Sequence, residues 1–147
     1  MRRLLIAMTC LALTGGAVPV AAQETTCAAG SFETLYRQSD ARLREFLQGM
    51  WQSEGPDTVG NLRRSTYSFH VNGTFTRDET VCFSASNTCH PTQGQGYFAT
   101  YSAQQGVLSL AMYENNQNCA VSHLVIQDRN TLYGARDPSR RPLRRIQ

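Results

Sequence analysis

Lysine is absent from this 147-residue chain, and all fourteen basic residues are arginines, which oppose eleven acidic residues. Removing Arg2 and Arg3 with the leader described below leaves twelve arginines against eleven carboxylates, a net charge of +1. Binding to nucleic acid through phosphate neutralisation needs a clear basic excess on one face. We therefore expect no nucleic-acid partner.

Several catalytic motifs are also missing. The sequence contains no metalloprotease helix, no glycine-rich phosphate loop and no nucleophile elbow. Its three histidines are scattered, and Asp78 and Glu79 would face opposite sides of a strand, so they cannot form a paired acid–base site. We expect a protein that is not an enzyme and holds no cofactor. No apolar run of 18 residues follows the first 22, which excludes a transmembrane helix there.

The first 22 residues have the three parts of a secretory signal peptide. Arg2 and Arg3 supply a positive start, residues 4–13 are apolar, and small residues precede a cleavage site after Ala22. We therefore expect a periplasmic or secreted mature chain of about 125 residues, the size of one domain.

Cysteines are even in number once the leader is set aside: Cys27, Cys82, Cys89 and Cys119. Four cysteines in an oxidising compartment predict two disulfides. No Cys-x2-Cys pair occurs, so no metal site is expected. Four cysteines allow three pairings. Because alternating turns place all four at one end of the fold proposed below, our first choice is Cys82–Cys89 with Cys27–Cys119.

The hydrophobic period changes at Gly49. Before it, residues 31–48 carry apolar side chains at helical spacing, which predicts one bent helix or two short helices. After it the period is two, and Gly, Pro, Asn and Asp fill the connections. The candidate strands are 50–54, 62–70, 74–83, 95–103, 107–113, 119–127, 131–135 and 141–146. These patterns predict an eight-stranded antiparallel up-and-down barrel over 49–147, preceded by an N-terminal segment and α-helix over 23–48.

The hairpin around Asn72-Gly73 indicates a register. A two-residue turn would set Phe69 opposite Thr76, whereas a three-residue loop with a left-handed Gly73 sets Phe69 opposite Phe75. The second arrangement puts Tyr67, Phe69 and Phe75 on one face, as a strand with one buried face requires. We expect the three-residue loop, residues 71–73.

Gly49-Met50-Trp51, after a helical lead-in, resembles the Gly-x-Trp signature of lipocalins and their calycin relatives. The resemblance spans Leu47 to Arg145 and implies a small lipocalin-like bacterial barrel whose tryptophan lies at the closed end. It also implies that a late arginine packs across the indole. Arg144 and Arg145 are the candidates, and Arg144 is our choice for this cation–π contact.

Aromatic and aliphatic side chains at strand spacing predict a binding protein with a largely filled barrel interior. The expected lining, which would bind a small apolar molecule, is Tyr67, Phe69, Phe75, Tyr97, Tyr101, Leu110 and Met112. We expect a monomer.

The alternative function is binding to a protein, including inhibition of a secreted or periplasmic enzyme. Small secreted bacterial barrels that inhibit metalloproteases present an N-terminal segment and rim loops to the enzyme. In this chain the corresponding parts would be residues 23–30 and a long loop over 83–94 that a disulfide preorganises.

Overall fold

The computed structural model describes residues 25–26, 32–115, 118–135 and 141–146. Two short helices, α1 (Phe32–Arg37) and α2 (Ala41–Leu47), precede the long strands. The strands are β1 (Thr25–Thr26), β2 (Gly49–Pro56), β3 (Leu62–Phe69), β4 (Thr74–Phe83), β5 (Thr88–Gln104), β6 (Val107–Glu114), β7 (Asn118–Asp128), β8 (Thr131–Gly134) and β9 (Leu143–Arg145). No described helix is long and apolar enough to cross a membrane. The expected leader, residues 1–22, lies outside the described residues.

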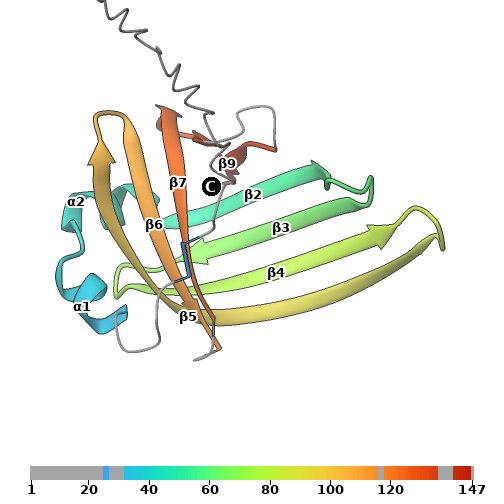
Figure 1. Ribbon diagram of the computed structural model, residues 1–147, viewed down its shortest axis with the longest axis horizontal. Helices are drawn as coiled ribbons and strands as arrows, with labels where there is room; N and C mark the ends of the chain where they lie inside the picture. Colours follow the sequence, from blue (N-terminus) through green and yellow to red (C-terminus); the bar gives the residue numbers. More distant parts are fainter. Residues whose placement is uncertain (1–24, 27–31, 116–117, 136–140, 147) are drawn as a thin grey trace, which may run out of the picture.

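Strands β2 to β9 form a closed antiparallel barrel (Figure 1). Strands β2 to β7 pair in chain order, β7 pairs with β8, and β9 closes the ring by pairing with both β8 and β2. This confirms the predicted eight-stranded barrel with a helical lead-in. The two-residue strand β1 lies outside the ring and pairs with Ala120 and Val121 of β7.

The β3–β4 hairpin has the predicted register. Phe69 lies opposite Phe75, and Gly73 has a φ of +81°, the left-handed region that favours glycine. The amide of His70 donates to the carbonyl of Thr74 at 2.9 Å, which closes the three-residue loop. Tyr67, Phe69 and Phe75 therefore share the inner face of the barrel.

The helical lead-in is two helices rather than one, and Ser39-Asp40 is the reason. The Asp40 carboxylate accepts hydrogen bonds from the amides of Arg42 and Leu43, which makes it the N-cap of α2. The Asp40 amide donates to the carbonyl of Thr100 at 2.7 Å, and the Thr100 amide donates to the Ser39 hydroxyl at 3.0 Å. Ser39 and Asp40, which link the two helices, thus satisfy the main chain of β5 at Thr100, beyond the point where β4 stops pairing with it.

The closed end of the barrel, where α2 meets β2, is built on Trp51. Its indole is fully buried and donates from Nε1 to the carbonyl of Leu47 at 2.7 Å. The guanidinium of Arg145 lies 4.4 Å from the centre of the Trp51 ring. It also donates to the carbonyls of Phe46, Gln48 and Arg129.

The choice of Arg144 for this contact is wrong, although the expectation that one of the two arginines covers Trp51 is confirmed. Arg145 lies opposite Trp51 in the β2–β9 ladder, so both side chains point inward. Arg144 lies opposite Gln52 and is exposed on the outer face. Alternation along a strand places neighbours on opposite faces, and the register decides which one meets the tryptophan.

The expected long loop between the strands predicted to end at residue 83 and to begin at residue 95 is also wrong. Strand β5 begins at Thr88, and its residues pair continuously with β4 from Thr88 opposite Phe83 to Tyr97 opposite Thr74. The connection between the two strands is therefore only residues 84–87. The polar composition of 88–95 and its Pro91 suggested a loop, but both are typical of an exposed edge strand.

Candidate functional site

The interior near the closed end is packed with apolar side chains. Of the seven residues expected to line a lumen, five belong to this cluster or pack against it: Tyr67, Phe69, Phe75, Leu110 and Met112. Their neighbours Trp51, Phe98 and Leu108 are fully buried. These residues pack against one another and form the hydrophobic core of the barrel.

Tyr97 and Tyr101 lie outside the barrel, which corrects their predicted place in the lumen. Tyr97 is 48% exposed, and Tyr101 packs in a second cluster that includes Tyr36 of α1. The inward positions of β5 are instead Phe98 and Thr100, because Phe98 lies opposite the inward Met112. The prediction therefore assigned the wrong set of alternate residues of β5 to the inner face, an error of one residue along the strand.

The middle of the interior carries a chain of charged side chains. The carboxylate of Glu79, which is only 6% exposed, accepts hydrogen bonds from Arg63 at 2.7 Å and from Arg77. Arg77 also donates to Glu114 at 2.7 Å. Two arginines and two glutamates thus neutralise one another above the apolar cluster. We call Arg63, Arg77, Glu79 and Glu114 the interior ion network.

Sequence reasoning missed the network, although part of its signal was present. The hairpin register already placed Arg77 on the face of Phe75, and Glu79 follows two residues later on that face. Gly94 could not have been recognised in advance: a Cβ there would overlap the Glu114 carboxylate, so the glycine makes room for it. Burial raises the pKa of Tyr67, whose hydroxyl lies beside this network.

The network offers no recognisable catalytic or metal-binding arrangement. Within the described ranges, no group of three His, Cys, Asp or Glu side chains is placed to hold a metal ion. Each carboxylate of the network is engaged by an arginine, so neither is a free base. The chemistry available here is charge pairing that links three strands of the barrel, β3, β4 and β6.

The most distinctive feature of the opposite, open end is the β4–β5 hairpin, which extends beyond the rest of the barrel (Figure 1). Strand β6 pairs with β5 only from Gly96, opposite Glu114, and the Asn115 amide donates to the Gln95 carbonyl at 3.0 Å. Among the described residues, 88–94 therefore pair with β4 alone. We call this segment of β5 the free edge.

The alternation of a β-ladder shows which main-chain groups the free edge presents. The carbonyl of Gln95 points away from β4, because it bonds Asn115 of the β6 side. Every second residue along an antiparallel strand points the same way. Cys89, Pro91 and Gln93 therefore direct their main-chain groups outward, and Pro91 has no N–H to donate.

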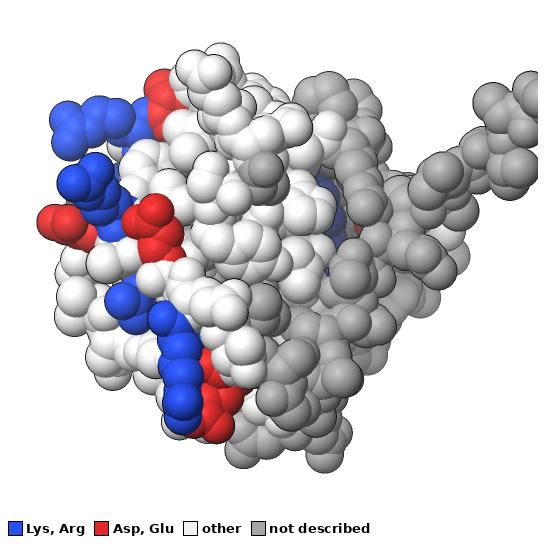
Figure 2. Space-filling view, turned by 60° about the vertical axis from the view of Figure 1, so that its left-hand side comes forward, with Lys and Arg blue, Asp and Glu red and all other residues white. Residues whose placement is uncertain are grey.

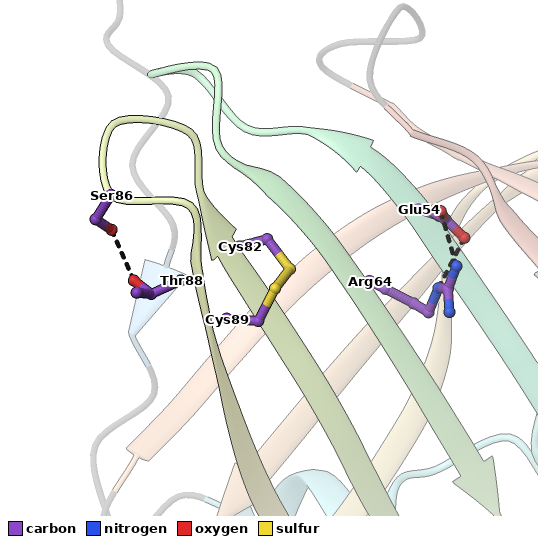
Figure 3. The surroundings of a disulfide bond; sticks show 6 residues. All are labelled: Glu54, Arg64, Cys82, Ser86, Thr88 and Cys89. Carbon is purple, nitrogen blue, oxygen red and sulfur yellow. Dashed lines mark hydrogen bonds and ion pairs between the residues drawn. A yellow bond between two sulfur atoms is a disulfide. The ribbon is translucent and has the colours of Figure 1, made fainter.

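A disulfide holds the two strands of this hairpin together (Figure 3). Cys82 and Cys89 are direct partners in the β4–β5 ladder, with their Cα atoms 4.0 Å apart, and their bond confirms the predicted pairing. Ser86 and Thr88 share a hydrogen bond of 2.6 Å across the turn. On the other face, the rings of Phe83 and His90 are in edge contact at 5.5 Å.

A side-chain ion pair also links the neighbouring strands β2 and β3. Arg64 of β3 donates to the Glu54 carboxylate of β2 through two nitrogens, at 2.8 and 3.0 Å (Figure 3). The hydrogen bond from Arg64 holds the pKa of Glu54 below its usual range. Three apolar side chains remain exposed around this end: Val59, Leu62 and Phe83.

The second predicted disulfide is tested only in part. Cys119 is disulfide-bonded, whereas its expected partner Cys27 lies outside the described residues. Strand β1 pairs Thr25 with Val121 and Thr26 with Ala120, a register that supports the predicted bridge. The bridge between Cys27 and Cys119 stays a prediction.

Charges of both signs occur together on one face of the molecule. On the face drawn in Figure 2, basic and acidic side chains lie next to one another along its left side, and uncharged residues cover the centre. Arg37 and Glu33 of α1 form an exposed ion pair at 2.6 Å.

The barrel is consistent with a lipocalin-like fold on the strength of its own topology and of its Trp51–Arg145 contact. No family model, no curated protein and no solved structure matches the chain.

Proposed function

We propose that this chain is a secreted or periplasmic lipocalin-like protein without enzymatic activity, which binds an extended segment of another protein along its free edge. The observation that carries the proposal is the β4–β5 hairpin: among the described residues, 88–94 of β5 pair with β4 alone, and the Cys82–Cys89 disulfide clamps them. Inhibition of a secreted or periplasmic enzyme is one form that such binding could take.

The main-chain groups of the free edge fit an added strand. The outward N–H groups of Cys89 and Gln93 and the outward carbonyls of Cys89, Pro91 and Gln93 offer five hydrogen bonds. Each is worth about 0.5–1.5 kcal/mol net. Peptides that add to a sheet edge gain affinity from such bonds and specificity from alternate side chains. The clamp lowers the entropy cost of binding because the edge is already extended.

Pro91 explains why a second copy of this chain is not the preferred occupant. A long regular edge strand invites pairing with the same edge of another molecule, and a proline interrupts the row of donors. Self-pairing about Pro91 would place two residues without N–H groups opposite each other. A partner strand of different sequence can place an apolar contact at that point instead.

A small apolar ligand inside the barrel has weaker support. The five inward residues of the predicted lining pack against Trp51, Phe98 and Leu108, and the ion network lies between this core and the open end. Native mass spectrometry of protein purified without detergent tests this alternative. A dissociable apolar mass would support the carrier and count against the proposal.

The experiment for the proposal selects binders from a library of displayed extended peptides and maps them by amide hydrogen exchange. We expect selected peptides to protect the amides of Cys89 and Gln93. Gln93→Pro removes one outward donor and should weaken binding by about tenfold, the effect of one good hydrogen bond. Gln93→Ala keeps the amide and is the matched control, with an expected change below about twofold.

Three outcomes would overturn the proposal. One is a library that gives no binder of the disulfide-bonded protein. The second is protection that maps to the barrel interior or to the helices. The third is equal weakening by the proline and alanine variants, which would assign binding to the Gln93 side chain. Size-exclusion chromatography coupled to light scattering completes the test, because a dimer that Gln93→Pro disrupts would identify a second copy as the occupant.

A further inference from the structure

A pocket at the closed end, remote from the free edge, has arginines at three of its six lining positions. It has a volume of about 620 Å³ and lies between α2, the β7–β8 turn and β9. Its walls are Arg42, Glu45, Phe46, Arg129, Asn130 and Arg145. Three guanidinium groups and one carboxylate therefore surround the same space.

The fold brings these arginines together through main-chain contacts. The amide of Arg145 donates to the carbonyl of Asn130 at 2.8 Å, and its side-chain Nε donates to the carbonyl of Arg129 at 3.3 Å. The hydrogen bonds of the Arg145 guanidinium are made to carbonyl groups, which are neutral. They hold the group in place, and no described carboxylate forms an ion pair with it.

Among the described residues, the pocket arginines form no ion pair with a carboxylate. The ion pairs of the described residues use Arg37, Arg63, Arg64 and Arg77, none of which lines the pocket. Glu45 is part of the wall, while the Asp40 and Asp128 carboxylates accept from main-chain amides at the start of α2 and in the β7–β8 turn. Burial, and then repulsion from Arg129, lower the pKa of Arg145.

We propose that this pocket binds a phosphoryl group. The lining residues themselves, three arginines and one glutamate, carry a charge of +2, opposite in sign to a phosphate monoester, which has a charge of about −1.5 to −2 at pH 7. Guanidinium groups bind phosphate oxygens through paired hydrogen bonds, and Arg42 and Arg129 are exposed enough to turn toward a ligand. Phe46 offers an apolar wall to whatever carries the phosphoryl group.

Two sources of the group are possible: a soluble phosphate compound or the headgroup of an anionic lipid. The test therefore has two arms on the full disulfide-bonded protein. In the first, binding of inorganic phosphate and of glycerol 3-phosphate is measured by isothermal titration calorimetry and by shifts of the Arg Nε–H signals in NMR spectra. In the second, co-sedimentation is measured with vesicles of phosphatidylcholine that contain or lack phosphatidic acid.

We expect binding in at least one arm, with a loss of about tenfold for Arg42→Gln and for Arg129→Gln, the effect of one charge-assisted contact. Arg64→Gln is the matched control. It removes the same charge from the open end and should change binding by less than about twofold. Both pocket positions are exposed, so we expect the variants to fold, as circular dichroism checks.

Binding only to vesicles with phosphatidic acid would identify a lipid headgroup, and binding of glycerol 3-phosphate would identify a soluble ligand. Either result supports the pocket if the two pocket variants lose it and Arg64→Gln keeps it. Equal losses in all three variants would show general charge attraction and overturn the proposal. The absence of binding in both arms would overturn it as well.

Discussion

Replacing Arg145 by alanine should lower the free energy of unfolding much more than replacing Arg144, the other arginine of β9. The guanidinium donates to three carbonyl groups and lies over the Trp51 ring. Two of these carbonyls, of Phe46 and Gln48, are at the C-terminal end of α2, where a positive charge is favourable. Each hydrogen bond contributes about 1 kcal/mol net, and the contact with the indole adds about 1 kcal/mol.

Because Arg145 is partly exposed, water replaces some of these contacts, and we expect a loss of about 3 kcal/mol in the free energy of unfolding. In a domain of this size that corresponds to a fall in Tm of roughly 10 °C. The assay is urea unfolding followed by tryptophan fluorescence and circular dichroism. Arg144→Ala, on the outer face of the same strand, should change stability by less than about 0.5 kcal/mol. A loss below about 1 kcal/mol for Arg145→Ala, or equal losses for both variants, would refute this account of the closed end.

Three further predictions concern the interior and the hairpin. Glu79→Gln removes the charge that compensates two arginines and should lower the free energy of unfolding, measured in urea, by about 2 kcal/mol. Asp78→Asn, on the outer face, should lower it by less than about 0.5 kcal/mol. Equal losses would contradict the interior ion network. Replacing Cys82 and Cys89 by serine opens a short loop and should cost about 2.5 kcal/mol, and an unchanged urea midpoint would contradict a formed bridge. Because the pKa of Tyr67 is raised in the folded state, stability should fall as pH rises through 10, where the unfolded tyrosine ionises first. Tyr67→Phe should flatten that fall, and an unaltered alkaline profile would show that Tyr67 does not cause it.

The barrel could be predicted from the sequence because turn residues and strand alternation agree over most of the chain. The Phe69–Phe75 register followed from a single glycine and from the need to bury three aromatic rings on one face. The Cys82–Cys89 bridge followed from the same alternation of turns. These features depend on neighbours in the sequence, which is why local patterns were sufficient.

The rest depends on contacts between distant segments. Arg145 rather than Arg144 meets Trp51 because of how the last strand pairs with the first, and no local pattern encodes that register. The inward face of β5 was misassigned for a related reason: Gly94 and Gly96 leave two inward positions of the strand without a side chain. The free edge was mistaken for a loop because polar residues and a proline are common in both.

The pairing of β9 with β2 has a consequence for how the chain reaches its folded state. β9 is only three residues long and follows all the other described strands in sequence, yet β2 and β8 both pair with it. A nascent chain that has not yet delivered residues 143–145 has an open sheet at both edges and Trp51 without its arginine. Final closure of the barrel therefore waits until residues 143–145 have been synthesised, and the strands that precede them stay in an unclosed sheet until then. For a protein proposed to cross a membrane before it folds, this delay preserves the unfolded form that export requires.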